Sequence, residues 1–186
     1  MTQNQKLRTF IAVEPESDIQ QKLAAIAQNF NHIPWAKRIR WLPANNIHIT
    51  MRFLGSIDPT LVETLSSQIE QVLNDFQAFA VTLTVPHLFP SAKRGRIIAA
   101  LTHADEKLHE LSSQIESVVV AAGMPAETRR FRGHITIGRS RTVIKNSELF
   151  THAQETLTMD VNKVIFYQSI LEKTGAQYVP LKTWVL

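Results

Sequence analysis

Cysteine is absent from the 186 residues of this chain. Its absence excludes disulfides, thiolate zinc sites and cysteine nucleophiles, and it fits a reducing compartment, so we expect a cytoplasmic protein. Glycine and proline are sparse, at 6 and 8 residues, and no low-complexity stretch interrupts the chain. No apolar run approaches the roughly 20 residues that a membrane-spanning helix needs. The first ten residues, MTQNQKLRTF, lack the pattern of a signal peptide, so we expect no membrane association.

Several well-known functional motifs are missing as well. There is no Gly-x-Gly-x-x-Gly or P-loop sequence, which argues against dinucleotide and P-loop nucleotide binding. There is no His-Glu-x-x-His, and no acidic residue stands at ligand-like spacing beside the histidines discussed below. A Gly-x-Ser-x-Gly nucleophile elbow is also lacking. We therefore expect neither a metal nor another cofactor.

The apolar pattern predicts an α+β fold. With 44% hydrophobic and 19% charged residues, the chain can bury a core of its own. Apolar residues at spacings of three and four predict helices, and alternating or short apolar runs predict strands. The expected helices cover residues 17–30, 58–76, 105–123 and, more briefly, 147–156; the expected strands cover 7–14, 48–54, 79–85, 96–101, 134–138, 162–171 and 178–186. Long helices between paired strands favour largely antiparallel sheets over a doubly wound sheet.

One short motif occurs twice. The stretch NIHITMRFLG contains His48, Ile49 and Thr50, and RGHITIGRSR repeats the same three residues 86 positions later, at His134 to Thr136. Each copy begins an expected strand, and each half of the chain holds one copy together with a long expected helix. The pattern indicates an internal duplication whose sequence similarity has otherwise faded.

The two residue types of the motif suit chemistry at a phosphate. Residues two apart on a strand point to the same side, so the histidine and threonine of each copy face a common space. Imidazole gives or takes a proton near neutral pH, and a threonine hydroxyl can donate to a phosphate oxygen. Two copies facing one cleft would supply an acid, a base and two donors for displacement at phosphorus. The alternative is two structural histidines that merely begin strands.

Arginines gather around both motifs. Eight of the eleven arginines lie near them in sequence, which favours an anionic ligand because the planar guanidinium matches phosphate and carboxylate oxygens. These are Arg38, Arg40, Arg52, Arg129, Arg130, Arg132, Arg139 and Arg141. For any single arginine, a solvated surface charge remains the alternative.

The chain resembles a known family in five blocks. The stretches RWLPANNIHITMRFLG, LFPSAKRGRII, RRFRGHITIGR, VIFYQSIL and YVPLKTWVL are together similar to the bacterial and archaeal RNA 2',3'-cyclic phosphodiesterases, also called 2'-5' RNA ligases, of the 2H phosphoesterase superfamily. The resemblance runs from Phe10 to the C-terminus. It implies a single bilobal domain over residues 1–186, in which two pseudo-symmetric antiparallel sheets face a central cleft and the helices lie outside.

The resemblance also implies the site. His48 is expected to be the proton donor and His134 the proton acceptor, while Thr50, Thr136 and Arg139 bind the substrate phosphate. Because strand parity would send Arg139 to the face opposite Thr136, we expect a bulge or a strand end at Gly138. The chain departs from the family at two positions. Ala99 stands where many members have an aromatic residue, and Gly133 replaces the usual proline, which should loosen the approach to His134.

The implied activity is metal-independent hydrolysis of an RNA-terminal 2',3'-cyclic phosphate to a 2'-phosphomonoester, with reversible 2'-5' ligation as a side reaction. The expected partners are RNAs with cyclic-phosphate ends, tRNA halves among them, with no membrane and no obligate protein partner. Two alternatives stay open: a 2H phosphodiesterase that acts on a small cyclic nucleotide, and a non-catalytic module that binds RNA ends.

Overall fold

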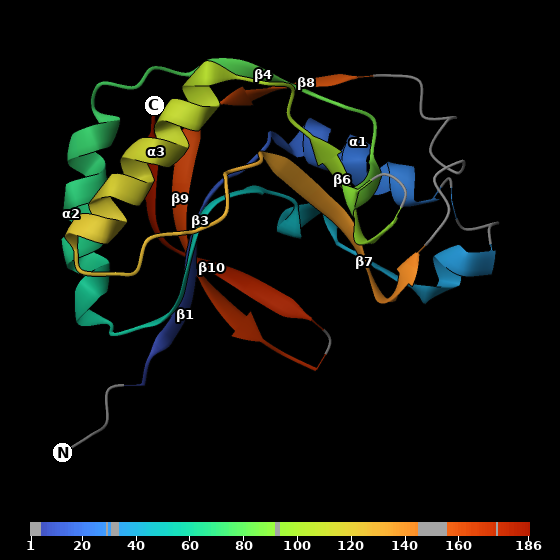
Figure 1. Ribbon diagram of the computed structural model, residues 1–186, viewed down its shortest axis with the longest axis horizontal. Coiled ribbons are helices and arrows are strands. Elements are labelled where there is room, and N and C mark those ends of the chain that lie inside the picture. Colours follow the sequence, from blue (N-terminus) through green and yellow to red (C-terminus); the bar gives the residue numbers. More distant parts are fainter. Residues whose placement is uncertain (1–4, 29, 31–33, 92–93, 145–155, 174) are drawn as a thin grey trace.

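Long helices separate groups of strands along the chain, and Figure 1 shows their arrangement. The structure is a computed structural model that describes residues 5–28, 30, 34–91, 94–144, 156–173 and 175–186. Its elements are β1 (Leu7–Val13), α1 (Ser17–Gln28), the 3-10 helix η1 (Pro34–Arg38), β2 (Ile39–Trp41), the 3-10 helix η2 (Ala44–Asn46), β3 (Ile49–Ile57), α2 (Thr60–Leu73), β4 (Phe79–Leu83), β5 (His87–Ser91), β6 (Arg94–Leu101), α3 (Glu106–Ala121), β7 (His134–Ile144), β8 (Leu157–Val161), β9 (Lys163–Leu171) and β10 (Ala176–Val185).

The main sheet consists of two antiparallel halves that meet at its centre. Its eight strands follow the order β10-β9-β1-β3-β7-β6-β5, with β2 paired to β7 outside this path. Strands β3 and β7 pair only through Ile49 and Ile135, the middle residues of the two His-Ile-Thr motifs. Four strands therefore lie on each side of that pair, and a separate ribbon of β4 and β8 completes the strands. The predicted α+β fold with antiparallel sheets is confirmed, and the two halves of the main sheet are joined at one residue pair.

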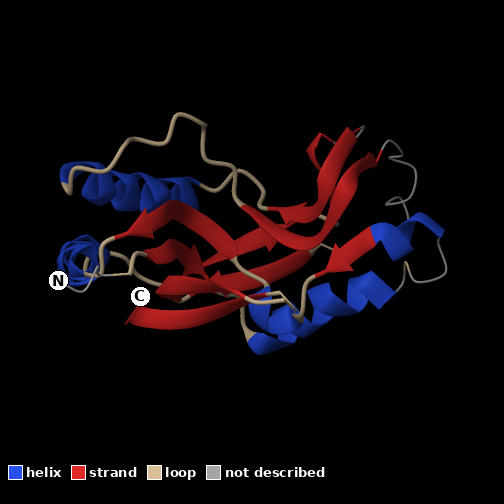
Figure 2. Cartoon of the chain, turned by 90° about the horizontal axis from the view of Figure 1, so that it is seen from below, coloured by secondary structure: helices blue, strands red, loops and turns tan. Residues whose placement is uncertain are grey.

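The helices cross over between the halves. Helix α1 follows β1 in the chain but packs on β7, whereas α3 follows β6 and packs on β3. Helix α2 lies beside α3 and contacts β10, so α2 and α3 cover one half of the sheet while α1 covers the other (Figures 1 and 2). Buried side chains from all three helices and from both half-sheets belong to one hydrophobic cluster. One hydrophobic core therefore extends across both halves of the main sheet.

Two helices begin where the sequence predicts. Asp58 Oδ1 accepts a hydrogen bond from the amide N–H of Thr60 at 2.9 Å, which satisfies a free donor at the start of α2. Asp105 caps α3 in the same way, through the amide N–H of Leu108 at 2.8 Å. Helix α3 ends before Gly123, whose φ of +86° is a left-handed value that glycine adopts readily.

Other predicted elements differ from the structure. Between the strands expected at 79–85 and 96–101, the structure has a further strand, β5, which forms a hairpin with β6 and pairs Phe89 with Ile97. Strands β2 and β8 were not expected at all. Each of these strands has too few apolar positions to show a period. Each also depends on pairing with a partner strand far away in the chain. The short helix expected at 147–156 lies outside the described residues except for its last position, which is not helical. Within the described part of the chain, no helix is long and apolar enough to span a bilayer.

Candidate active site

His48 immediately precedes β3 and is fixed by two hydrogen bonds. Its Nδ1 lies 2.9 Å from the carbonyl oxygen of Asn46, to which it donates. Its Nε2 lies 3.1 Å from the hydroxyl oxygen of Thr50. In the neutral ring, Nε2 then carries the lone pair and accepts from that hydroxyl. The predicted pairing of histidine and threonine on one side of the strand is therefore present at the first motif.

His134, the first residue of β7, is held in the same way. Its Nδ1 lies 2.8 Å from the carbonyl oxygen of Arg132, again two residues earlier in the chain. In both rings Nδ1–H is therefore engaged by a backbone carbonyl, which leaves Nε2 as the nitrogen that can exchange a proton. Thr136 follows on β7 and is buried. The duplication thus extends from the sequence to the hydrogen-bonding state of the imidazoles.

A β-bulge brings Arg139 into line with Thr136. Along the β6–β7 ladder, no residue of β6 lies opposite Ile137, so β7 contains one extra residue between Thr136 and Gly138. The extra residue reverses the alternation of side chains and sends Arg139 to the side of Thr136. The bulge predicted at Gly138 is confirmed within one residue.

The first motif has a bulge at the same place. No residue of β1 lies opposite Met51, which directly follows Thr50 as Ile137 follows Thr136. By the same count, Phe53 on β3 is the counterpart of Arg139 on β7. The Phe53 side chain is 43% exposed, and the guanidinium of Arg8 lies 4.7 Å from its ring centroid. Three residues after its threonine, the second motif therefore has a cation, Arg139, and the first motif has an aromatic ring, Phe53.

Aromatic rings hold the two imidazoles. Phe10 stacks on His48 with ring centroids 4.9 Å apart, and Tyr178 meets the same imidazole edge-on at 5.2 Å. Phe89 stacks on His134 at 4.4 Å. No sequence spacing links these three rings to the motifs, because the rings come from other strands. Only the strand pairings could have revealed them: β1 with β3 for Phe10, β10 with β9 and β9 with β1 for Tyr178, and β5 with β6 next to β7 for Phe89.

The surroundings favour the neutral form of both histidines. Burial lowers the pKa of His48 to about 4, and the charges of Arg139 and His134 lower it further. Burial also lowers the pKa of His134, with Arg139 and Arg132 acting in the same direction. The backbone carbonyls oppose both shifts. Because Arg139 acts on both rings, the structure brings the two histidines and this arginine together.

The two departures from the family pattern have structural explanations. Ala99 on β6 lies opposite Thr136, as Ala12 on β1 lies opposite Thr50, and both alanines are fully buried. Ala99 therefore continues the pseudo-symmetry.

The expectation that Gly133 loosens the approach to His134 is wrong. The carbonyl oxygen of Gly133 accepts from the amide N–H of Thr102 at 2.9 Å and from its hydroxyl at 3.3 Å. A Cβ at Gly133 would collide with Thr102 and Leu108. The segment before His134 is therefore tightly packed, and glycine is needed there for close approach.

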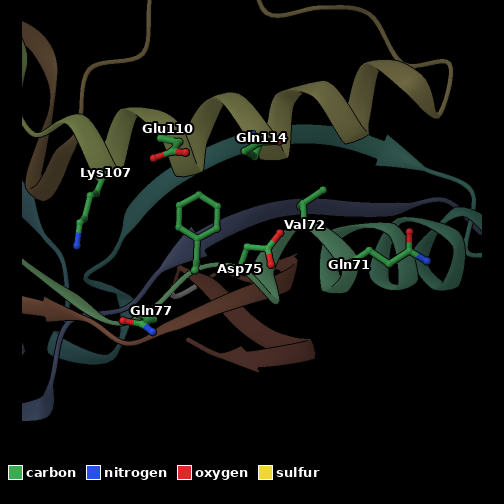
Figure 3. A pocket seen from close by; sticks show the side chains of 8 residues that line it. Gln71, Val72, Asp75, Gln77, Lys107, Glu110 and Gln114 are labelled. Atoms are coloured by element: carbon green, nitrogen blue, oxygen red, sulfur yellow. The ribbon is translucent and has the colours of Figure 1, made fainter.

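A cavity of about 870 Å³ opens beside the second motif. It reaches Thr50 and His134, and its other sides are formed by β3, by β5, by α3 and by the arginine-rich residues 129–132. His109 lines it from α3 and is half-buried. A second hollow, of about 460 Å³, lies between α2 and α3 and is lined by polar side chains such as Gln71, Asp75 and Gln114 (Figure 3). None of the predicted site residues lines that second hollow.

The clustered arginines differ in accessibility. Arg38, Arg40, Arg130 and Arg132 are exposed, and Arg40 on β2 lies directly opposite Arg139 in the β2–β7 ladder. The Arg52 side chain, in contrast, is only 10% exposed and pairs with acidic residues. Among the described residues, no group of three histidine or acidic side chains is arranged to hold a metal ion.

The sequence is similar to a known family and to a known protein. The family of LigT-like phosphoesterases matches residues 13–99, which include the first His-Ile-Thr motif. The RNA 2',3'-cyclic phosphodiesterase of Methanocaldococcus jannaschii is 24% identical over 186 residues, covering 96% of this chain and 100% of that protein.

Solved structures share the fold over nearly the whole chain. A crystal structure from Thermus thermophilus aligns with a TM-score of 0.79 at 19% identity and covers 97% of this chain and 98% of its own. The crystal structure of E. coli LigT complexed with 3'-AMP aligns with a TM-score of 0.76 at 22% identity, with the same coverage. These likenesses confirm the predicted fold.

Proposed function

We propose that this chain, a relative of the LigT-like phosphoesterases as its sequence predicts, hydrolyses the 2',3'-cyclic phosphate at an RNA end to a 2'-phosphomonoester. The observation that carries the proposal is the paired arrangement of His48 and His134. Each imidazole donates from Nδ1 to a carbonyl two residues earlier and keeps Nε2 for proton transfer. The name of the M. jannaschii relative agrees with this activity.

In the proposed mechanism, His134 is the proton acceptor and His48 the proton donor. Nε2 of His134 takes a proton from a water molecule as the water oxygen forms a bond to phosphorus. The bond between phosphorus and the 3'-oxygen breaks, and the departing oxygen takes the proton from Nε2 of His48. Thr50, Thr136 and Arg139 hold the non-bridging oxygens and stabilise their charge in the transition state. These groups provide the acid, the base and the charge stabilisation from the chain itself.

The donor role requires the substrate's own charge. In the free protein, a pKa of about 4 leaves His48 mostly neutral, with Nε2 accepting from Thr50. A bound phosphate anion favours the imidazolium and raises its pKa. If an RNA 5'-hydroxyl replaces water, the same displacement forms a 2'-5' linkage, but water is far more abundant and hydrolysis should dominate.

The deciding experiment is turnover of an oligoribonucleotide with a 2',3'-cyclic phosphate end in excess EDTA. We expect a 2'-phosphomonoester product at a rate that the chelator leaves unchanged. The matched substrate is a 2',3'-cyclic mononucleotide, which a small-nucleotide enzyme would prefer. Binding of the oligonucleotide without turnover would instead indicate an RNA-end-binding module, and loss of turnover in EDTA with recovery on adding a divalent cation would overturn the two-histidine mechanism.

The pH profile should reflect the lowered pKa values. The reactive form carries one proton on the histidine pair, and in the free protein this form is most abundant between the two pKa values. Since the pKa of His48 is about 4 and that of His134 lies below its usual value of 6.5, kcat/KM should follow a bell with its maximum below pH 6.5. The kcat profile should lie at higher pH, because bound phosphate stabilises the imidazolium. A kcat/KM maximum above pH 7 would contradict the burial of the pair.

RNA binding should weaken as salt rises. Arg38, Arg40, Arg130 and Arg132 are exposed, and each phosphate that they contact adds about −0.7 to the slope of log affinity against log salt. Arg130→Ala and Arg132→Ala should each reduce the slope, measured by fluorescence anisotropy with a single-stranded RNA. Lys22→Ala on α1, where the side chain is 57% exposed, is the control that should leave it unchanged. A flat salt response would instead favour the small cyclic nucleotide as substrate.

A further inference from the structure

Arg52 lines the cavity, but acidic side chains already hold its guanidinium. Its guanidinium forms ion pairs with Glu116 of α3 and with Glu127 of the segment after α3, the second at 3.9 Å. It also donates to the carbonyl oxygens of Pro125 and, at 3.2 Å, of Phe53. With these partners and only 10% of its side chain exposed, Arg52 has little capacity left for a phosphate.

The partners of Arg52 are themselves joined. Glu116 Oε1 accepts from the amide N–H of Glu127 at 2.7 Å. The carboxylate of Glu127 accepts from the amide, Nε and Nη2 of Arg129, and these hydrogen bonds lower the pKa of Glu127 to about 2. Arg52 and Arg129 thus offset the charges of Glu116 and Glu127, and the cluster has no net charge. An anion would find no excess of positive charge here.

The segment bound by this cluster forms a wall of the cavity. Residues 124–133 contain no helix or strand between α3 and β7, so contacts of this kind must hold them in place. Arg130, Phe131 and Arg132 line the cavity. Arg132 also lies over the ring of Phe89 at 4.7 Å, and its carbonyl oxygen accepts from His134.

We propose that Arg52 is a positioning residue that fixes residues 125–132 to α3, and thereby sets the cavity wall along which the RNA strand leading to the cyclic phosphate lies. The proposal rests on the proposed function for the identity of the ligand. It assigns to Arg52 a role opposite to the one that its place beside the first motif suggests. An arginine that bound phosphate would need a free guanidinium, and here the guanidinium is engaged by two carboxylates and two backbone carbonyls.

Glu116→Gln separates the two roles by the sign of its effect. If Arg52 positions the segment, removing the Glu116 charge loosens the wall, and KM for the cyclic-phosphate oligonucleotide rises while kcat changes less. If Arg52 binds phosphate, the same substitution frees its guanidinium, and KM falls. Arg52→Met should raise KM as Glu116→Gln does, and the double variant should be no worse than the single ones, because both changes break one unit.

Trypsin provides a readout that does not depend on activity. Cleavage after Arg129, Arg130 and Arg132 requires the segment to leave the wall, and losing a hydrogen bond between charged groups shifts such an equilibrium by about 10- to 150-fold. Cleavage at these sites should therefore be at least about tenfold faster in Arg52→Met and in Glu116→Gln than in the unmodified protein. Lys182→Met is the matched control, because it removes an exposed ion pair between Glu70 of α2 and β10 that involves none of residues 125–132, and it should leave the cleavage rate unchanged.

The outcomes separate this proposal from the proposed function. Faster cleavage in both variants, with an increased KM, supports the positioning role. Faster cleavage in both variants of a protein that shows no cyclic-phosphate turnover would support the positioning role of Arg52 and reject the proposed phosphodiesterase function. Unchanged cleavage together with a lower KM in Glu116→Gln would overturn the proposal. Should Arg52→Met fail to fold, Glu116→Gln decides alone, since it keeps the arginine and the shape of its partner.

Discussion

His48→Ala and His134→Ala should each lower kcat on a cyclic-phosphate oligonucleotide by about 10²- to 10⁴-fold, the usual contribution of one general acid or base. Both imidazoles keep Nε2 for proton transfer, and Arg139 lowers the pKa of both, so one phosphate can engage the pair. Single-turnover kinetics would measure the loss. His103→Ala, at an exposed histidine in the loop after β6, is the matched control and should behave like the unmodified protein.

The double variant and the leaving group refine this prediction. If the histidines act as one unit, the loss in the double variant should be smaller than the product of the two single losses. A substrate whose leaving group needs no proton should restore much of the rate to the variant that lacks the acid, and little to the variant that lacks the base. With His48 as the donor, His48→Ala is the variant that should be rescued. Near-normal turnover in either single variant would remove the basis of the two-histidine mechanism.

Arg139→Ala should be the most damaging change outside the histidines. A hydrogen bond to a charged group contributes about 1.5–3 kcal/mol, so Thr50→Ala and Thr136→Ala should each cost about 10- to 150-fold in kcat/KM, and Arg139→Ala at least as much. Arg139→Ala should also shift the pH profile upward, because the charge that lowers the pKa of both histidines would be gone. That shift distinguishes Arg139 from the two neutral threonines.

Two exposed residues provide matched controls for these three variants. Arg96→Ala removes an exposed arginine from β6, and Thr158→Ala removes an exposed threonine from β8. Both should leave kcat/KM and its pH profile unchanged. If all three site variants remained within about twofold of the unmodified protein, these residues would not hold the phosphate, since a single charged hydrogen bond is already worth more.

The sequence predicts those parts of this fold that depend on local pattern. The capping residues Asp58 and Asp105 and the glycine after α3 are local signals, and each lies at the end of an observed helix. The bulge beside Gly138 could also be predicted, because the need to bring Arg139 to the side of Thr136 conflicts with strict alternation. Strands β2 and β8 could not, since their existence depends on partners far away in the chain.

The candidate site shows the same division. The repeated His-Ile-Thr identifies the imidazoles, but nothing in its spacing indicates Phe10 or Phe89, which reach them from neighbouring strands. Counting arginines near the motif grouped Arg52 with the arginines that favour an anionic ligand. In the structure its fork lies between Glu116 and Glu127, which stand 64 and 75 positions further along the chain.

The contact between Ile49 and Ile135 has a consequence for which of the two ester oxygens, 2' or 3', leaves the phosphorus. Each isoleucine meets its own equivalent there, as residues on the axis of a symmetric dimer do. A centre built around such an axis offers the same imidazole and hydroxyl to either flank of a bound phosphate, and so cannot by itself tell the 2'-oxygen from the 3'-oxygen. Regioselectivity must then come from side chains in which the flanks differ, with Arg139 on one and Phe53 on the other.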